Sequence, residues 1–286
     1  MDFTLSEELT SVQQLAQQIF TDFTAVDQLK ATEQQEQRFD ANLWQALAEA
    51  GLLGLDIEES HGGIDLGFYA LSSLCEEVGR TAAPVPAVPV LVSAAGTLRR
   101  FATDKQKEQL LSGIVSGAHL VTAALEEYGN DNPAAPSARA QLVEGGCSIS
   151  GTKICVSHAA SAKRILLSAQ TGEELIVVLV DPHAAGITLR PQTVTSGEIL
   201  HELVLDGVQV PDEDIVARGG KALEAMQWAQ QATRTALCAM TVGISDKMMR
   251  MTGSYTTERE QFGRPVATFQ AVSHRAADCY IDVECL

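Results

Sequence analysis

The sequence is poor in positive charge and in aromatic side chains. Its 286 residues include 20 lysines and arginines against 37 aspartates and glutamates, a formal net charge of −17, and only 5% aromatic residues. Because binding to nucleic acid requires a basic surface, this charge excludes nucleic acid as an expected partner. Anionic membrane surfaces are disfavoured for the same reason. Hydrophobic residues make up 45% of the chain, enough for the core of one or two domains.

Motifs for metal binding, export and membrane insertion are also missing. The six cysteines form no CxxC pair and the six histidines no HExxH arrangement, so we expect no metal site. The opening MDFTLSEELT has neither a basic nor an apolar leader segment, and runs such as LIVVLV are too short to span a bilayer. We therefore expect a reduced, cytoplasmic protein without a membrane partner.

Residues 1–118 show the periodicity of helices. Apolar side chains recur at helical spacing along one face at Leu5, Leu9, Val12, Ala16, Ile19 and Phe23. Ser6 and Asp40 are predicted N-caps, the second for the helix ANLWQALAEA, and a third helix is predicted over FYALSSLCEEVGR. Thr103 and Gln106 have capping-box spacing. These patterns predict an all-helical N-terminal domain.

Residues 119–217 show the sequence pattern of β-strands. Short β-branched runs such as ELIVVLV and LHELVLDGVQV alternate with turn residues. Glu144-Gly145-Gly146 and Thr171-Gly172-Glu173 have the composition of hairpin loops. We therefore expect a middle domain built on an antiparallel sheet.

Residues 218–286 return to a helical pattern. A stretch rich in Ala, Met and Gln runs from Gly219 to about Glu260, longer than an ordinary globular helix, and a second helix begins near Phe269. That helix still continues at Leu286. A lone pair of long helices cannot bury its own apolar faces, so either a partner chain completes this domain or the sequence is a piece of a longer protein.

The order of these regions and four segments carry a family resemblance. The segments are GLLGLDIEESHGG, SGTKICVSHAASAKRILL, LHELVLDGVQVPDEDIV and, most specifically, YTTEREQFGRPVATFQAVSHRAAD over residues 255–278. Over essentially the whole chain, the sequence resembles the acyl-CoA dehydrogenase family. The resemblance implies an α+β fold with an N-terminal helical domain, a middle antiparallel β-barrel domain and a C-terminal long-helix bundle, here truncated.

The resemblance implies FAD as cofactor, with contacts from the C-terminal helical region and from the middle domain. Arg259 would reach the flavin pyrophosphate of a neighbouring subunit, because its planar guanidinium pairs bidentately with phosphate, and Gln270 and Phe262 would lie nearby. Another interpretation of Arg259 is an exposed arginine paired with Glu258 or Glu260.

The flavin ring would contact the middle domain. Backbone groups of Leu125 and Glu126 align with the family's ring-binding stretch, and Ser157 aligns with its hydroxyl residue. Cys155 replaces the tryptophan that stacks on the flavin, and Val156 follows it; both can also be ordinary strand residues. We expect Cys155 to be a small buried side chain and His158 to face solvent at a loop edge.

The position of one catalytic base is altered. The family's reaction needs a carboxylate to remove the α-proton of an acyl-CoA while the flavin accepts a hydride. The residue before Arg234, where one group of relatives has this base, is Thr233, and the acidic residue three positions before that arginine is Gln231. In other relatives the base lies in later helices, at a position beyond Leu286. We therefore expect no catalytic carboxylate in this chain. Arg234 and Gln231 are the candidate substrate-binding residues, with an ion-paired helix arginine as the alternative for Arg234.

With these departures, the chain resembles the degenerate subunit of heterotetrameric (α2β2) steroid side-chain acyl-CoA dehydrogenases. The resemblance implies an acyl-CoA substrate, a second acyl-CoA dehydrogenase subunit or self-association, and an electron-transfer flavoprotein as acceptor. Three alternatives stay open: a self-sufficient dehydrogenase with its base in a further C-terminal part, a flavin-free scaffold subunit, and an unrelated helical/β protein.

Overall fold

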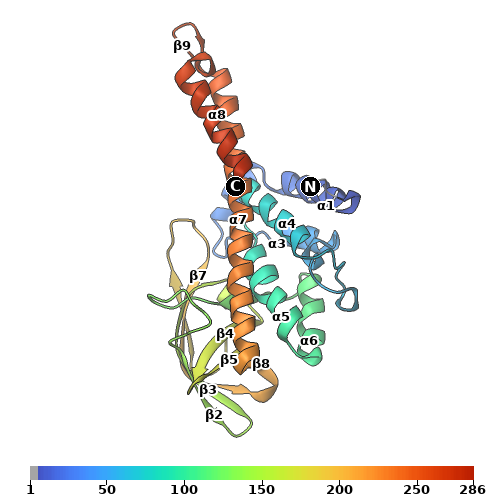
Figure 1. Ribbon diagram of the computed structural model, residues 1–286, viewed down its shortest axis with the longest axis vertical. Helices are drawn as coiled ribbons and strands as arrows, with labels where there is room; N and C mark the ends of the chain where they lie inside the picture. Colours follow the sequence, from blue (N-terminus) through green and yellow to red (C-terminus); the bar gives the residue numbers. More distant parts are fainter. Residues whose placement is uncertain (1–5) are drawn as a thin grey trace.

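The N-terminal third of the protein is helical in the computed structural model, which describes residues 6–286 (Figure 1). Its helices are α1 (Glu7–Phe23), α2 (Val26–Glu33), α3 (Ala41–Glu49), α4 (Phe68–Thr81), the π-helix η3 (Ala87–Ala95), α5 (Gly96–Phe101) and α6 (Asp104–Val115), with short 3₁₀ turns η1 (Leu52–Gly54) and η2 (Glu59–His61). The expected apolar face of α1 packs on the core, with Ala16 and Phe20 fully buried. Leu5 lies outside the described residues.

The predicted helix caps are confirmed. Ser6 Oγ accepts a hydrogen bond from the Leu9 N–H at 3.2 Å, and Asp40 accepts from the N–H groups of the first turn of α3. Thr103 and Gln106 form the reciprocal capping box at the start of α6. Each cap satisfies N–H groups that the first helical turn leaves unpaired.

Two helices are not apparent in the sequence pattern. The segment of α2 carries no strong apolar periodicity, and η3 follows a proline-rich stretch. Pro86 directly precedes η3 and Pro89 lies in its first turn, where a missing N–H breaks no internal hydrogen bond. These prolines therefore lie at the beginning of the helix, which is of the π type.

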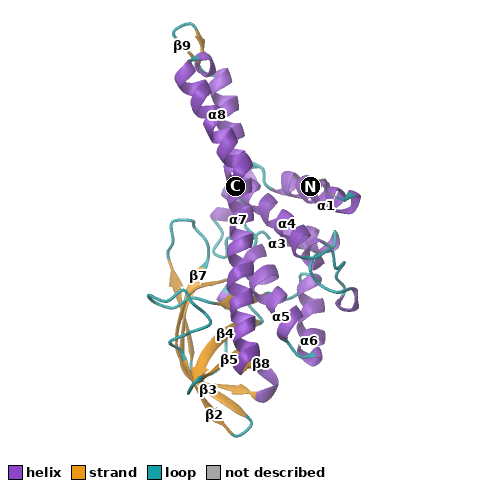
Figure 2. Cartoon of the chain, in the orientation of Figure 1, coloured by secondary structure: helices purple, strands orange, loops and turns teal. Residues whose placement is uncertain are grey.

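The middle region is an eight-stranded sheet (Figure 2). Its strands are β1 (Val121–Ala124), β2 (Arg139–Val143), β3 (Gly146–Ser157), β4 (Arg164–Thr171), β5 (Glu174–Val180), β6 (Ile187–Gln192), β7 (Leu200–Pro211) and β8 (Ile215–Arg218), with 3₁₀ turns η4 (Ala159–Ser161) and η5 (Asp212–Asp214). Both predicted hairpin loops are confirmed, because Val143 pairs with Gly146 and Thr171 with Glu174.

The strand pairing departs from a purely antiparallel sheet. The order is β6-β7-β3-β2-β4-β5-β8, and β1 pairs in parallel with β4, as β2 does over one residue pair. The hairpin of β2 and β3 lies between β1 and β4 in the sequence, and a connection of this length allows two strands to run in the same direction. Among the described residues the pairings form an open path from β6 to β8, without the expected closure into a barrel.

The last region consists of two long helices. As predicted, α7 is continuous over forty residues (Gly219–Glu258), and α8 (Gln270–Cys285) runs back along it after the hairpin β9 (Glu260–Gln261) and β10 (Arg264–Pro265) and the turn η6 (Val266–Thr268). Figure 1 shows the end of α7 and the beginning of α8 projecting beyond the rest of the protein, while the end of α8 returns to the level of α1. No residue of α8 is buried.

Side chains on the two faces of the sheet enter two separate cores. Along β4, Leu166 packs into the core shared with the helices, whereas Ile165 and Leu167 belong to the second core, on the other face. This alternation follows from the two-residue period of a strand. The first half of α7 contributes Ala222, Met226 and further alanines to the helical core.

A close crossing of α4 and α7 fixes the position of the long helix. A Cβ atom on Gly79 would lie 2.1 Å from the Met240 carbonyl oxygen, and one on Gly243 would lie 2.0 Å from the Glu76 carbonyl oxygen. Beside this contact, Arg80 of α4 pairs with Asp246 of α7. The two backbones are therefore in direct contact, with a part-buried ion pair beside them.

Within residues 6–286, none of the helices combines the length and the apolar character that crossing a membrane requires.

Glycine-to-alanine substitutions in α7 test the crossing. We expect Gly243→Ala to lower the free energy of unfolding by at least ~2 kcal/mol, because the new methyl group forces the two helix backbones apart. Gly253→Ala is the matched control: apart from its own helix backbone, nothing lies within 4 Å of its added Cβ, and alanine favours helix by up to ~1 kcal/mol. Urea unfolding of both variants measures the difference, and equal midpoints would contradict the contact.

Candidate functional site

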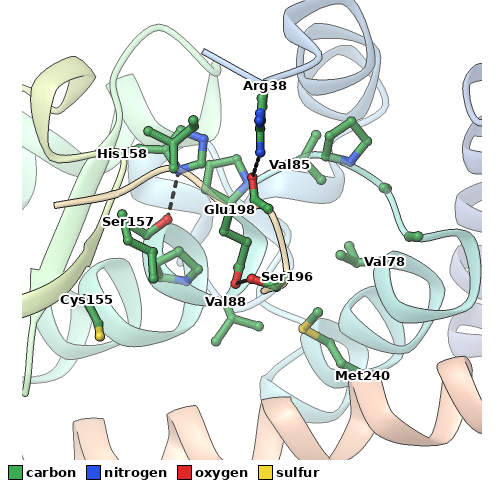
Figure 3. A pocket seen from close by; sticks show the side chains of 18 of the residues that line it. Arg38, Val78, Val85, Val88, Cys155, Ser157, His158, Ser196, Glu198 and Met240 are labelled. Atoms are coloured by element: carbon green, nitrogen blue, oxygen red, sulfur yellow. Dashed lines mark hydrogen bonds between the residues drawn. The ribbon is translucent and has the colours of Figure 1, made fainter. Parts of the chain in front are cut away.

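A cavity of about 620 Å³ lies where the three regions meet (Figure 3). We call it the central cavity. It is bounded by α2, the end of α4, the segment 82–93 that leads into η3, the end of β3, the loop 196–199 and the middle of α7. Its volume falls in the range of cavities that bind small molecules or cofactors.

Most of the cavity wall is apolar. Side chains from α4, the segment 82–93 and α7 form this surface, among them Val78, Val85, Val88, Leu237 and Met240. An apolar wall with a few polar groups favours a largely hydrocarbon or aromatic ligand, which the polar groups orient.

One polar group is the pair Ser157 and His158 at the end of β3. Ser157 Oγ lies 2.8 Å from His158 Nδ1, and both residues line the cavity. Burial, and to a smaller extent the neighbouring His201, lowers the pKa of His158 to about 4. The imidazole is therefore neutral at pH 7. The expectation that His158 faces solvent is wrong, because the left-handed backbone at this residue (φ 51°) turns the ring inward beside Phe39.

A second polar group is formed by Glu126 and Cys155. The Ile154 N–H donates to the Glu126 carbonyl at 2.9 Å, which joins the segment after β1 to β3. Partial burial and the Glu126 carboxylate raise the pKa of the Cys155 thiol. Cys155 is exposed at the cavity rather than buried as expected, because its positive φ (55°) interrupts the alternation of the strand.

The loop 196–199 covers one side of the cavity. Arg38 Nη1 donates to the Gly197 carbonyl at 2.8 Å, across 159 residues of sequence. In the same loop Ser196 Oγ donates to Glu198 Oε2 at 2.8 Å, and Figure 3 shows the Glu198 side chain directed toward the cavity. The bond from Arg38 to Gly197 joins the sheet region to the helical region at the rim of the cavity.

A buried ion pair holds the segment behind Glu126 in place. Lys153 Nζ lies 2.7 Å from Glu127 Oε1, and the two side chains are 0% and 5% exposed. Burial opposes the ionisation of Glu127, but Lys153 and the N–H groups of Ser137 and Ala138 outweigh it and lower the pKa of the carboxyl group. The pair fixes the start of the loop 127–138 against β3.

On α7, Thr233 faces the cavity and its neighbours do not. Thr233 Oγ1 lies 2.7 Å from Ser93 Oγ of η3. Arg234 is exposed and pairs with Asp131 of the loop 127–138 at 3.1 Å, and Gln231 is also exposed. The arginine thus makes the ion pair given above as its alternative interpretation, and the cavity wall contains neither Arg234 nor Gln231.

The remaining candidate residues lie at the far tip of the α7–α8 hairpin. Phe262 and Gly263 both have positive φ and form the two-residue turn between β9 and β10. Phe262 is 93% exposed and contacts Phe269 edge-on, with ring centroids 6.2 Å apart. Arg259 and Gln270 are exposed beside this turn.

The structure therefore brings together only some of the candidate residues. Leu125, Glu126, Cys155 and Ser157 line the central cavity, with Thr233 opposite, while Val156 is fully buried in the second core. The cavity also contains Ser93, Arg38, Glu198 and His158, to which the sequence analysis gave no role. Of these only His158 had a local signal, its position next to Ser157.

Comparisons with known proteins give relatives along the whole chain. The model of the acyl-CoA dehydrogenase N-terminal domain matches residues 6–118, and that of the C-terminal domain matches residues 220–286. The chain is 30% identical to acyl-CoA dehydrogenase FadE27 of Mycobacterium tuberculosis over 99% of its own length and 74% of that relative. FadE28 of the same organism is 33% identical, over 83% of this chain and 66% of that relative.

Two similar solved structures are assemblies of two proteins. One is described as a Tcur3481-Tcur3483 steroid ACAD G363A variant, with a TM-score of 0.90 and 43% identity, covering 98% of this chain and 75% of that one. The other is the ChsE4-ChsE5 complex from Mycobacterium tuberculosis, with a TM-score of 0.92 and 30% identity, covering 99% and 76%.

The burial of His158 predicts a pH-dependent stability. The folded-state pKa of about 4 lies below the value of about 6.5 expected in the unfolded chain, so between these values the unfolded state binds more protons. The free energy of unfolding should therefore fall as the pH drops from 7 to 4.5. We expect His158→Gln to remove on the order of 2 kcal/mol of this fall.

Urea unfolding at both pH values measures this effect, and His183→Gln is the control. His183 is exposed in the turn before β6, and its replacement should leave the pH dependence unchanged. Equal pH dependence in the wild type and in His158→Gln would show that the imidazole is not buried in its neutral form.

Proposed function

Because the chain belongs to the acyl-CoA dehydrogenase family, we propose that it is an FAD-dependent subunit that dehydrogenates an acyl-CoA thioester between Cα and Cβ, with the catalytic carboxylate supplied by a partner subunit. The proposed substrate is a steroid side-chain CoA thioester, and the proposed electron acceptor is an electron-transfer flavoprotein. The chemistry that FAD supplies when bound is acceptance of the hydride from Cβ.

The observation that carries the proposal is Thr233 in the wall of the central cavity. The family resemblance aligns this position with one of the family's two base positions, and in the structure its side chain faces the cavity and contacts Ser93. A threonine hydroxyl cannot take the role of a carboxylate in removing an α-proton at neutral pH. A carboxylate from another chain would complete the reaction.

The central cavity has groups that fit a flavin ring. The backbone of Leu125 and Glu126 lies at one side, and Ser157 presents a hydroxyl group next to a neutral imidazole. Cys155, in the place of the family's stacking residue, offers no aromatic face. Residues of this chain would thus hold the ring through hydrogen bonds more than through stacking.

The expected pyrophosphate contact lies elsewhere. Arg259 follows Thr233 by 26 positions of nearly continuous helix, a distance of about 39 Å at 1.5 Å per residue. Arg259 therefore lies far from the central cavity of its own chain. This separation supports a flavin site assembled from two chains, in which the hairpin tip of one chain reaches the cofactor of another.

The exposed side of the α7–α8 hairpin supports association with a partner. Apolar side chains that are more than half exposed gather on these two helices at Met248, Met251, Tyr255, Tyr280 and Ile281. Several exposed apolar side chains on one helical hairpin are typical of interfaces. The two structures of paired proteins described above, one of them a steroid enzyme, support a second acyl-CoA dehydrogenase subunit as the occupant and a steroid acyl group as the substrate.

A self-sufficient enzyme is the second candidate, and one observation favours it. Glu198 and Glu126 both place carboxylates at the rim of the central cavity. Both residues are exposed, and Glu198 lies in a loop held by Arg38, whereas a catalytic base gains from a buried position that raises its pKa. We therefore favour the partner as the source of the base.

Flavin retention tests the composite site. We expect the chain co-expressed with its partner subunit to purify with a flavin absorption spectrum. Arg259→Ala should reduce the bound flavin at least about tenfold, because a charge-assisted contact with phosphate is lost. Arg259→Lys should keep part of it, because the charge remains without the bidentate geometry.

Arg139→Ala, on the exposed strand β2, is the charge-matched control and should leave the flavin content unchanged. A colourless co-complex would favour a scaffold subunit. An Arg259→Ala co-complex with full flavin content would contradict the two-chain site.

A further inference from the structure

Two hydroxyl groups meet inside the otherwise apolar part of the central cavity. Ser93 of η3 is 3% exposed, and its Oγ lies 2.7 Å from Thr233 Oγ1 and 3.2 Å from the Val88 carbonyl oxygen. Thr233 is partly exposed toward the cavity. The pair is thus a polar group that a ligand in the cavity can reach from the side of Thr233.

Thr233 differs from the other threonines of α7 in its hydrogen bonding. Five of them donate to the carbonyl oxygen four residues earlier in the same helix, namely Thr235, Thr241, Thr252, Thr256 and Thr257. This local bond is the usual one for a threonine within a helix. The Thr233 hydroxyl points instead across to η3.

The direction of the hydrogen bonds follows from the number of protons. A hydroxyl group has one proton and two lone pairs, and the Val88 carbonyl can only accept. Both bonds form together only if Ser93 donates to Val88 and Thr233 donates to Ser93. Thr233 Oγ1 then has no proton left for the cavity, and presents only lone pairs there.

We propose that Thr233 Oγ1 is a specificity-determining hydrogen-bond acceptor, which selects an apolar acyl group that carries a hydroxyl substituent. The inference rests on the proposed function, because it takes the cavity to hold the acyl part of the substrate. A ligand hydroxyl can donate to Thr233. A ketone oxygen at the same place would face lone pairs and lose its own hydration, an unfavourable contact in an apolar site.

Equilibrium binding to matched steroid acids tests the inference. The probes are 5β-cholanic acid, its monohydroxylated derivatives and the corresponding ketones, titrated calorimetrically into the purified co-complex. We expect at least one hydroxylated acid to bind about three- to tenfold more tightly than its ketone, the effect of one hydrogen bond. Thr233→Val keeps the shape of the side chain and should abolish that preference, while binding of cholanic acid itself stays the same or tightens.

Two further variants separate this role from a structural one. Thr235→Val, two positions away with its hydroxyl bonded within the helix, should change no preference. Ser93→Ala frees the Thr233 proton and should narrow the preference for hydroxyl over ketone. Three outcomes would each overturn the inference. Thr233→Val could change the binding of all three classes of ligand equally, the wild type could prefer ketones, or no acid could bind.

The binding test is independent of dehydrogenation. It requires neither a catalytic base nor reduction of the flavin, so a failure of the proposed reaction leaves its outcome readable. Conversely, the heteromeric enzyme could be active and yet show no preference for hydroxylated acids that depends on Thr233. That result would overturn the inferred specificity and leave the proposed function in place.

Discussion

The direct backbone contact between α4 and α7 is the constraint on which the rest of the structure depends. Gly79 and Gly243 allow each helix to touch a carbonyl oxygen of the other, and the Arg80–Asp246 pair lies beside the contact. Side chains of ordinary size would hold two helix axes 8–10 Å apart. The close crossing sets where the forty-residue helix leaves the core: the part before the crossing contributes to the cavity wall, and the part after it projects into solvent.

This division of α7 explains why the chemistry of the chain is split. The first half carries Thr233 to the central cavity, where Ser157, Glu126 and Ser93 also meet. The second half carries Arg259 and Phe262 to a tip far from that cavity. The proposed sharing of cofactor site and reaction with a partner subunit would account for both the exposed hairpin and the threonine at position 233.

The sequence predicts those features that local chemistry determines. Caps such as Ser6 and Asp40, the two hairpin loops and the length of α7 follow from residues close together in the chain. The π-helix and the parallel pairing of β1 depend on tertiary packing and were not predictable. The same holds for the cavity: Arg38 meets Gly197 across 159 residues, and Ser93 meets Thr233 across 140. The place of Thr233 came from family resemblance, and the flavin contact of Arg259 stays a prediction.

Exchange of the substrate's α-proton tests most directly the claim that the base comes from another chain. The chain alone and the co-complex are incubated with a saturated steroid acyl-CoA in D₂O without an electron acceptor, and deuterium at Cα is followed by mass spectrometry. We expect exchange catalysed by the co-complex and none above the buffer rate by the chain alone. Exchange by the chain alone, lost in Glu198→Gln or Glu126→Gln, would contradict it and place the base at the rim of its own cavity.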